Sequence, residues 1–215
     1  TNHLGMMWQM PFAGETKPAL DPSVEAFEGF GTTVAVAGNV MVVGSRDDYD
    51  TDGDGTIETG AGSAYIYLRS SQGTWNLLKQ LKPSDARTLG NFGESVAISG
   101  NTLVIGAGGA NAAYIFQKDQ GGINNWGEVK KLVASDGTQR DRFGDSVAIS
   151  GNTVVVGAPL ESHDIDGNGT DDLLVGAAYI FFKDKGGTNN WGEVKKLVAS
   201  DAQINPGQVG ELFGN

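Results

Sequence analysis

Two stretches of the chain carry oxygen-bearing side chains at alternate positions, a spacing that suits a hard cation. A glycine, Gly55 or Gly169, follows the third of these side chains and allows the sharp turn that brings them together. Calcium takes about six to eight oxygen ligands, whereas zinc and copper prefer imidazole or sulfur. The sequence therefore predicts two Ca²⁺ sites. Their expected ligands are Asp50, Asp52, Asp54, Thr56 and Glu58 in the first loop, and Asp164, Asp166, Asn168, Thr170 and Asp172 in the second.

These loops differ from an EF-hand. Ala61 and Val175 stand where an EF-hand has its last glutamate, and a strand rather than a helix is expected to follow. Thr56 and Thr170 are expected to offer backbone carbonyls. The alternative is an acidic turn without metal, although several carboxylates in so short a loop would repel one another. The neighbouring acids are expected to be flanking charges rather than ligands: Asp47, Asp48, Glu161 and Asp171.

Both loops occupy the same place in a sequence repeat. Phe-Gly recurs at Phe30, Phe92, Phe143 and Phe213, and the first three open similar phrases, such as FGESVAISGNTLVIG and FGDSVAISGNTVVVG. Each phrase leads to an Ala-Tyr-Ile segment and then to a segment that begins with tryptophan. Residues 113–136 and 178–201 are identical at 21 of 24 positions. Such internal similarity indicates a repeat architecture.

Each unit predicts four strands. In the second unit, Val96 and Ile98 alternate with small residues and predict the first strand, and Gly100-Asn101 predicts a two-residue turn of type II′. Residues 103–105, 113–116 and 128–134 predict the second, third and outermost strands.

Residues that recur between units receive structural rather than chemical roles. The paired lysines Lys130-Lys131 and Lys195-Lys196 are expected to be solvated charges on an edge strand. The repeated aromatic residues are expected to pack in the core or between units. These are Tyr65, Tyr114, Tyr179, Trp126 and Trp191.

Four-stranded units with a period of about 50 residues predict an all-β fold, an array of antiparallel β-propeller-like blades. The expected blades are residues 30–91 and 143–212, each with a calcium loop, and 92–142 without one. Residues 1–29 form an N-terminal segment, in which 4–12 is a candidate outer or donated strand, and residues 213–215 open a fourth repeat. Three blades make an incomplete ring, since propellers need about four to eight. Three interpretations stay open: a fragment of a larger propeller, completion by neighbouring copies, or an open array.

Composition excludes several classes of partner. Asp and Glu outnumber Lys and Arg by 26 to 15, and the formal net charge of −11 argues against nucleic acid and anionic membranes. The absence of cysteine excludes disulfides and thiolate metal sites. No apolar run reaches the ~18 residues that span a bilayer, and an intact signal peptide is not expected in the chain.

Phe143-Gly144 followed by Gly157-Ala158-Pro159 resembles the FG-GAP repeat, which occurs in the N-terminal β-propeller of integrin α chains and in bacterial surface proteins. The resemblance covers roughly residues 30–215, although the other units keep Phe-Gly and lose Gly-Ala-Pro. It implies a seven-bladed propeller with calcium loops, placed outside the cell or on its surface, that works in adhesion or surface assembly.

The sequence therefore favours an extracellular, calcium-binding structural or adhesion module that acts through protein–protein contacts. One alternative is a fibre subunit, in which copies join head to tail by sheet completion into a homo-oligomer or polymer. Another is a hydrolase domain, for which His3 and His163 are the available histidines. No nucleophile signature accompanies either histidine, so the chain is expected not to be an enzyme.

Overall fold

A computed structural model describes residues 29–48, 59–138, 140–162, 175–188 and 190–199. The described residues form twelve strands and one short 3-10 helix. None of them forms a helix long and apolar enough to cross a membrane. The strands are β1 (Phe30–Ala37), β2 (Val40–Ser45), β3 (Ser63–Arg69), β4 (Trp75–Leu81), β5 (Ser95–Ser99), β6 (Thr102–Ala107), β7 (Ala112–Lys118), β8 (Trp126–Leu132), β9 (Ser146–Ser150), β10 (Thr153–Ala158), β11 (Ala177–Lys183) and β12 (Trp191–Leu197).

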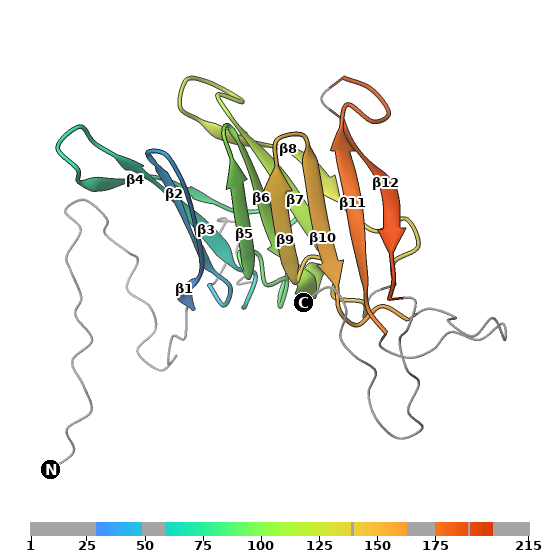
Figure 1. The fold of residues 1–215 in the computed structure, drawn as a ribbon. Helices are drawn as coiled ribbons and strands as arrows, with labels where there is room; N and C mark the ends of the chain where they lie inside the picture. Colours follow the sequence, from blue (N-terminus) through green and yellow to red (C-terminus); the bar gives the residue numbers. More distant parts are fainter. Residues whose placement is uncertain (1–28, 49–58, 139, 163–174, 189, 200–215) are drawn as a thin grey trace, which may run out of the picture.

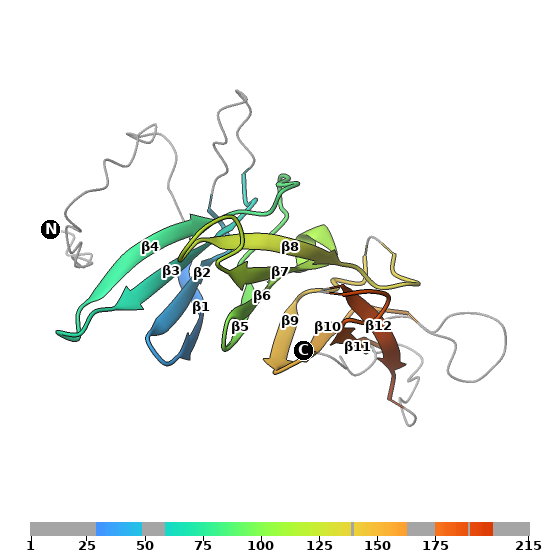
Figure 2. The same cartoon turned by 90° about the horizontal axis from the view of Figure 1, so that it is seen from above.

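The strands form three antiparallel sheets, each built from four strands that are consecutive in the chain. We call them blade 1 (β1–β4), blade 2 (β5–β8) and blade 3 (β9–β12). The blades stand side by side (Figure 1) and fan along an arc, with β1, β5 and β9 on its inner side and β4 and β8 on its outer side (Figure 2). The predicted all-β, blade-like fold is confirmed, and the described residues do not close a ring. The predicted outer strand at 4–12 and residues 213–215 lie outside them.

Local sequence accounts for the strands and turns of blade 2. Gly100 has a φ of +57°, the sign that the predicted type II′ turn requires at its first position. It places Ser99 opposite Thr102 in the ladder between β5 and β6. The outer strand begins at Trp126, two residues before the predicted start. Hydrophobic alternation therefore locates each strand, while the hydrogen-bonded strand is longer than the alternating segment by one or two residues.

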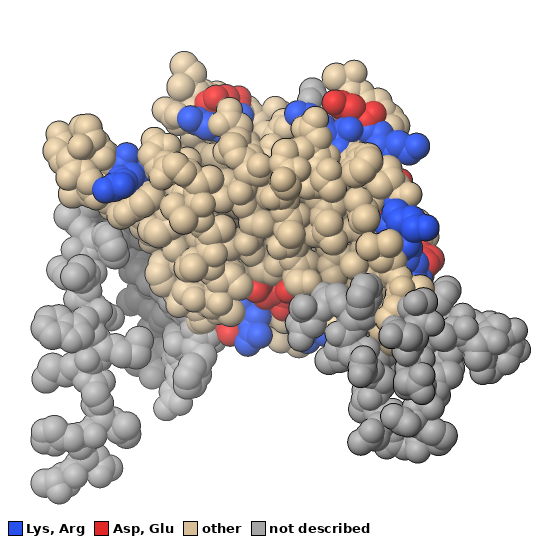
Figure 3. All heavy atoms as spheres, viewed as in Figure 1, with Lys and Arg blue, Asp and Glu red and all other residues tan. Residues whose placement is uncertain are grey.

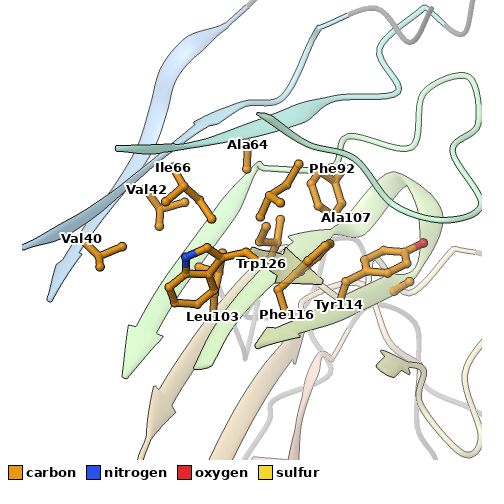
Figure 4. Close-up of a cluster of buried hydrophobic side chains, with 13 residues drawn as sticks. Val40, Val42, Ala64, Ile66, Phe92, Leu103, Ala107, Tyr114, Phe116 and Trp126 are labelled. Carbon is orange, nitrogen blue, oxygen red and sulfur yellow. The ribbon is translucent and has the colours of Figure 1, made fainter. Parts of the chain in front are cut away.

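The apolar core lies between blades rather than inside one blade. One cluster joins blades 1 and 2, and a second joins blades 2 and 3. In the first, Val42 and Ile66 of blade 1 point toward Leu103 and Trp126 of blade 2 (Figure 4). Burial of apolar surface is the main favourable term in folding, so this packing between blades supplies the main stabilisation of the array.

Aromatic side chains repeat the same packing at both junctions. Phe92 meets Tyr114 edge-on, with ring centroids 5.5 Å apart, and Phe143 meets Tyr179 in the same way at 5.4 Å. The prediction that the repeated tyrosines and tryptophans pack between units is confirmed for Tyr114, Tyr179, Trp126 and Trp191, which are all buried. Tyr65 is only half-buried, because no described blade covers its side of blade 1.

Charged side chains are distributed unevenly on the inner side of the arc. Figure 3 shows them near the upper and lower ends and along the right margin, while the middle of this face carries none. The inner strands β1, β5 and β9 read FGTTVAVA, SVAIS and SVAIS, without any charged residue. Blade-to-blade recognition by charge must therefore occur at the ends of the strands or on the outer strands.

Candidate calcium loops and the seams between blades

The two candidate calcium loops leave from the same corner of their blades. One connects β2 to β3 and the other connects β10 to β11. A backbone hydrogen bond closes the base of each loop. The Gly62 N–H donates to the Asp48 carbonyl at 3.0 Å, and the Gly176 N–H donates to the Glu161 carbonyl at 2.9 Å. The first predicted ligand precedes each of these glycines by the same number of residues. The two acidic patterns therefore begin at equivalent positions relative to these backbone hydrogen bonds.

The side chain of Asp48 fixes the base of the first loop. It is buried, and its Oδ2 accepts a hydrogen bond from the Tyr65 hydroxyl at 2.7 Å and another from Gln80 Nε2 at 3.3 Å. Gln80 also donates to Ser63 Oγ at 2.9 Å. Beyond the flanking charge predicted from sequence, Asp48 therefore has a structural role within its own blade.

Glu161 takes the corresponding place at the base of the second loop. It is buried, and Lys196 Nζ donates to its Oε1 at 2.5 Å. The same ammonium group donates to Asp136 Oδ2 of blade 2 at 2.8 Å. Lys196 thus links the base of the second loop to the preceding blade, whereas Asp48 links the base of the first loop to its own blade.

All ten predicted calcium ligands lie outside the described residues, so the two sites stay a prediction. Within the part of the chain that the structure describes, no group of three or more His, Cys, Asp or Glu side chains could hold a metal. In blade 2, the 3-10 turn Gly108–Ala110 replaces the long loop and ends at Asn111, whose φ is +49°. This turn carries no acidic residue, in agreement with its sequence.

We call the contact between two neighbouring blades a seam: the first seam joins blades 1 and 2, and the second joins blades 2 and 3. The Phe-Gly pair is explained by the close approach of two backbones at each seam. Gly144 has a φ of +106°, and a Cβ built on it would stand 2.1 Å from the carbonyl oxygen of Ala112. A Cβ on Gly106 would stand 1.9 Å from the carbonyl oxygen of Gly144. The first seam repeats this packing at Gly44 and Gly93. Since real Cβ contacts are never this short, each seam requires glycine on both sides.

A polar clasp joins blade 1 to blade 2 near their outer strands. Ser84 donates through its backbone N–H and its Oγ to the two carboxylate oxygens of Glu128, each at 2.9 Å. The adjacent Asp85 accepts from the Tyr114 hydroxyl at 2.8 Å and from Lys131 Nζ at 2.5 Å. We call this set of contacts the Ser-Asp clasp.

The second seam repeats the Ser-Asp clasp contact for contact. Ser135 donates to Glu193 at 3.0 and 2.9 Å, and Asp136 accepts from Tyr179 and Lys196 at 2.8 Å each. The clasp therefore needs Ser-Asp after the outer strand of one blade and Glu-x-x-Lys within the outer strand of the next.

The paired lysines lie on outer strands, as predicted. Lys131 and Lys196 are not simply solvated charges, however, because each also binds a carboxylate of the preceding blade. Burial acts to raise the pKa of Asp85, but hydrogen bonds from Lys131 and Tyr114 outweigh it and lower that pKa. Burial and the hydrogen bond to Asp85 raise the pKa of Tyr114, so its hydroxyl remains a donor. The sequence signal for the clasp is the regular recurrence of Ser-Asp and Glu-x-x-Lys.

Removing the clasp carboxylate is expected to weaken the second seam. Glu193→Ala should lower the free energy of unfolding by about 1–2 kcal/mol, because both hydrogen bonds from Ser135 are lost at a partly solvated site. Lys195→Ala, an exposed neighbour on the same strand, should change it by less than about 0.5 kcal/mol. Urea unfolding followed by tryptophan fluorescence measures both variants. An equal decrease in the free energy of unfolding for the two variants would show that the clasp does not stabilise the protein.

Two carboxylates lie close together where blade 2 meets blade 3, and both contact Arg142. Glu94 accepts hydrogen bonds from the Gly108 N–H and, at 3.2 Å, from Arg142 Nη2. Arg142 Nε also contacts both oxygens of Asp145, at 2.7 and 2.9 Å. Burial and the charge of Asp145 raise the pKa of Glu94 to about 7, against the opposing effects of the Gly108 N–H and Arg142. Glu94 therefore titrates near neutral pH.

The chain matches the FG-GAP repeat over residues 20–67, 75–121 and 126–181. The second and third matches begin at Trp75 and Trp126, the first residues of β4 and β8. These two matches therefore each join the outer strand of one blade to strands of the next. No curated protein sequence matches the chain significantly. Because the matched segments cover most of the chain and build three blade-like sheets, the protein belongs to the FG-GAP repeat family.

Proposed function

We propose that the protein is a calcium-binding extracellular module that serves structure or adhesion through protein–protein contacts. FG-GAP repeats form β-propeller-like interaction modules and are typical of extracellular proteins. The observation that carries the proposal is that the two acidic patterns occupy equivalent positions in their blades, each ahead of a backbone hydrogen bond donated by Gly62 or Gly176.

The chemistry of the loops supports calcium as the bound ion. The predicted ligand set consists of carboxylate, amide and carbonyl oxygens, which Ca²⁺ prefers. In a protein with a formal net charge of −11, several carboxylates in one short loop would repel one another without a cation. At ~1 mM calcium and dissociation constants of ~10⁻⁴–10⁻³ M, each site would add roughly 0.4–1.4 kcal/mol to stability. Calcium would therefore order the loops without being required for the blades to fold.

Calcium titration tests the proposal directly. Isothermal calorimetry of the wild-type chain should give two bound Ca²⁺ ions, and Asp166→Ala should remove one of them, because it takes away a predicted oxygen ligand of the second loop. Asp119→Asn removes the same charge from a hairpin of blade 2 and should leave both ions bound. Wild-type protein that binds no calcium, or an Asp166→Ala variant that binds as much as the wild type, would contradict the calcium assignment.

In this role the protein binds other protein surfaces and performs no catalytic step. A head-to-tail fibre of copies is the second candidate, and the apolar end faces favour it, since Phe30 of blade 1 and Leu197 of blade 3 are exposed. Blade 1, however, carries Leu77 and Gln80 where blade 2 carries Glu128 and Lys131. A second copy would therefore meet blade 1 without the charged half of the Ser-Asp clasp, and for this reason we favour the module.

A further inference from the structure

The connections that follow the outer strands of blades 1 and 2 have the same length but differ in side-chain size. Residues 81–92 read LKPSDARTLGNF, and residues 132–143 read LVASDGTQRDRF. Both run from the last leucine of the outer strand to the phenylalanine of the next Phe-Gly pair. At four positions the second connection carries the smaller side chain, and the second seam should therefore be filled less completely than the first. Val133, Ala134, Gly137 and Thr138 stand where the first connection has Lys82, Pro83, Ala86 and Arg87.

This difference leaves a pocket of about 300 Å³ at the second seam, which we call the second-seam pocket. At the first seam, largely equivalent residues, among them Pro83 and Phe92, enclose no space for a water molecule. A volume of about 300 Å³ is at the lower end of the range for ligand pockets, so the second-seam pocket has room for a small ligand. Its lining includes Arg87, Asn111, Val133, Ala134, Gly137 and Thr138.

Arg87 gives the second-seam pocket its charge. Among the described residues that line the pocket, it alone carries a charge. Its Nη2 donates to the carbonyl oxygen of Gly109 in the 3-10 turn, which holds the guanidinium group in place. The carboxylates of the two Ser-Asp clasps are already bound to Lys131 and Lys196, and no described carboxylate forms an ion pair with Arg87. A guanidinium group has further N–H donors, so Arg87 can still bind an anion.

The rest of the lining favours a ligand with a hydrocarbon part. Val133 is 53% exposed although it is aliphatic, and Ala134 packs against the apolar core between blades 2 and 3. The polar side chains of the lining bond within the protein: Thr138 Oγ1 donates to Asp141, and Asn111 Oδ1 accepts from a backbone N–H at 3.3 Å. Apolar surface beside a fixed cation suits a ligand that has an aliphatic part and one negative charge.

We propose that the second-seam pocket binds a carboxylate carried on a short aliphatic chain. The carboxylate would accept hydrogen bonds from Arg87, and the chain would cover Val133 and Ala134. A planar guanidinium group matches the geometry of a carboxylate, and charge-assisted hydrogen bonds are stronger than neutral ones. A free aliphatic acid and the C-terminus of a protein chain that ends in an aliphatic residue both offer this chemistry. None of the named lining residues belongs to a candidate calcium loop, so carboxylate binding and calcium binding can be tested separately.

Titration of the wild-type chain with 4-methylpentanoate, followed by ¹H–¹⁵N NMR at fixed calcium concentration, tests the pocket. We expect saturable shifts of the Asn111, Gly137 and Thr138 amides, with a dissociation constant of ~1–10 mM. The uncharged 4-methylpentanamide has the same shape and should bind about tenfold more weakly, because it loses the ionic contact with Arg87. Acetate keeps the charge without the chain and should also bind about tenfold more weakly.

Two substitutions separate the charge of Arg87 from the charge of the protein as a whole. Arg87→Gln should weaken binding of 4-methylpentanoate about tenfold. Arg140→Gln removes the same charge from an exposed position on the same connection, outside the named lining, and should leave the dissociation constant unchanged. Val133→Ser should weaken binding about fourfold, because it removes apolar surface that the chain would cover. Circular dichroism shows whether each variant is folded.

The peptide N-acetyl-Ala-Ala-Leu, with a free carboxyl end, distinguishes the two sources of the carboxylate. Tighter binding than that of 4-methylpentanoate would indicate the end of a protein chain, and weaker binding would indicate a free acid; either result supports the site. Equal binding of 4-methylpentanoate and 4-methylpentanamide by the wild type would overturn the proposal, whether or not Arg87→Gln folds. A folded Arg87→Gln variant that binds 4-methylpentanoate as tightly as the wild type would overturn it as well.

Discussion

Replacing Gly144 by alanine is expected to lower the free energy of unfolding by about 4 kcal/mol, among the largest effects of a single substitution. Two costs combine at this position. The φ of +106° is unfavourable for any residue with a side chain, and the new Cβ would meet the Ala112 carbonyl oxygen at 2.1 Å. Because that oxygen belongs to the backbone of blade 2, relief of the clash requires the seam itself to open.

Gly31 offers a control at the same position of the repeat. Its φ is +88°, but no described atom lies within 4 Å of a Cβ built there. Gly31→Ala should therefore cost only the conformational part, about 1–2 kcal/mol. Urea unfolding at fixed calcium concentration measures both variants. Similar losses for Gly31→Ala and Gly144→Ala would mean that backbone conformation, rather than contact between blades, explains the Phe-Gly pair.

Glu94→Gln is expected to stabilise the protein at pH 8 by up to about 3 kcal/mol and to have little effect at pH 4.5. The pKa of Glu94 is raised from 4.5 to about 7 by burial and by Asp145, and one pKa unit corresponds to about 1.4 kcal/mol. Between these two pH values the folded protein binds a proton that the unfolded chain releases, so stability falls as pH rises. Glutamine keeps the shape of the protonated side chain and carries no charge.

The measurement is the free energy of unfolding from pH 4.5 to 8, with calcium in excess. The wild type should lose the contribution of Glu94 as pH rises through 7, and Glu94→Gln should show a flatter profile over that interval. Asp145→Asn tests the physical cause, because removing the neighbouring charge should move the midpoint of the wild-type loss to lower pH. A Glu94→Gln profile parallel to that of the wild type would show that Glu94 does not titrate in this interval.

The acidic loops and the seams illustrate two kinds of sequence signal. The Asp-x-Asp-x-Asp/Asn-Gly pattern is contiguous, so its chemistry can be inferred without knowledge of the fold, and calcium binding remains a prediction to be measured. The Ser-Asp clasp joins Ser84 to Glu128, 44 positions apart in sequence. Each of its residues is an ordinary polar residue of a strand end or edge, and for that reason the sequence alone predicts solvated charges at Lys131 and Lys196.

Local sequence was sufficient to predict the strands, their turns and the number of repeated units. These features depend on neighbours in the chain: alternation at Val96 and Ile98, and a glycine able to adopt positive φ at Gly100. Repetition then indicated blades, because one such sheet cannot bury its apolar faces alone.

The roles of the repeated residues at the seams became visible only in the packed array. The pKa of Glu94 is raised because packing against the neighbouring blade buries its carboxyl group and because blade 3 brings the charge of Asp145 beside it. The requirement for glycine at Gly106 arises because the backbone of Gly144 passes within contact distance. Both effects depend on distances between separate sheets. Such distances are set by how the apolar faces pack, and a linear pattern of residues does not contain them.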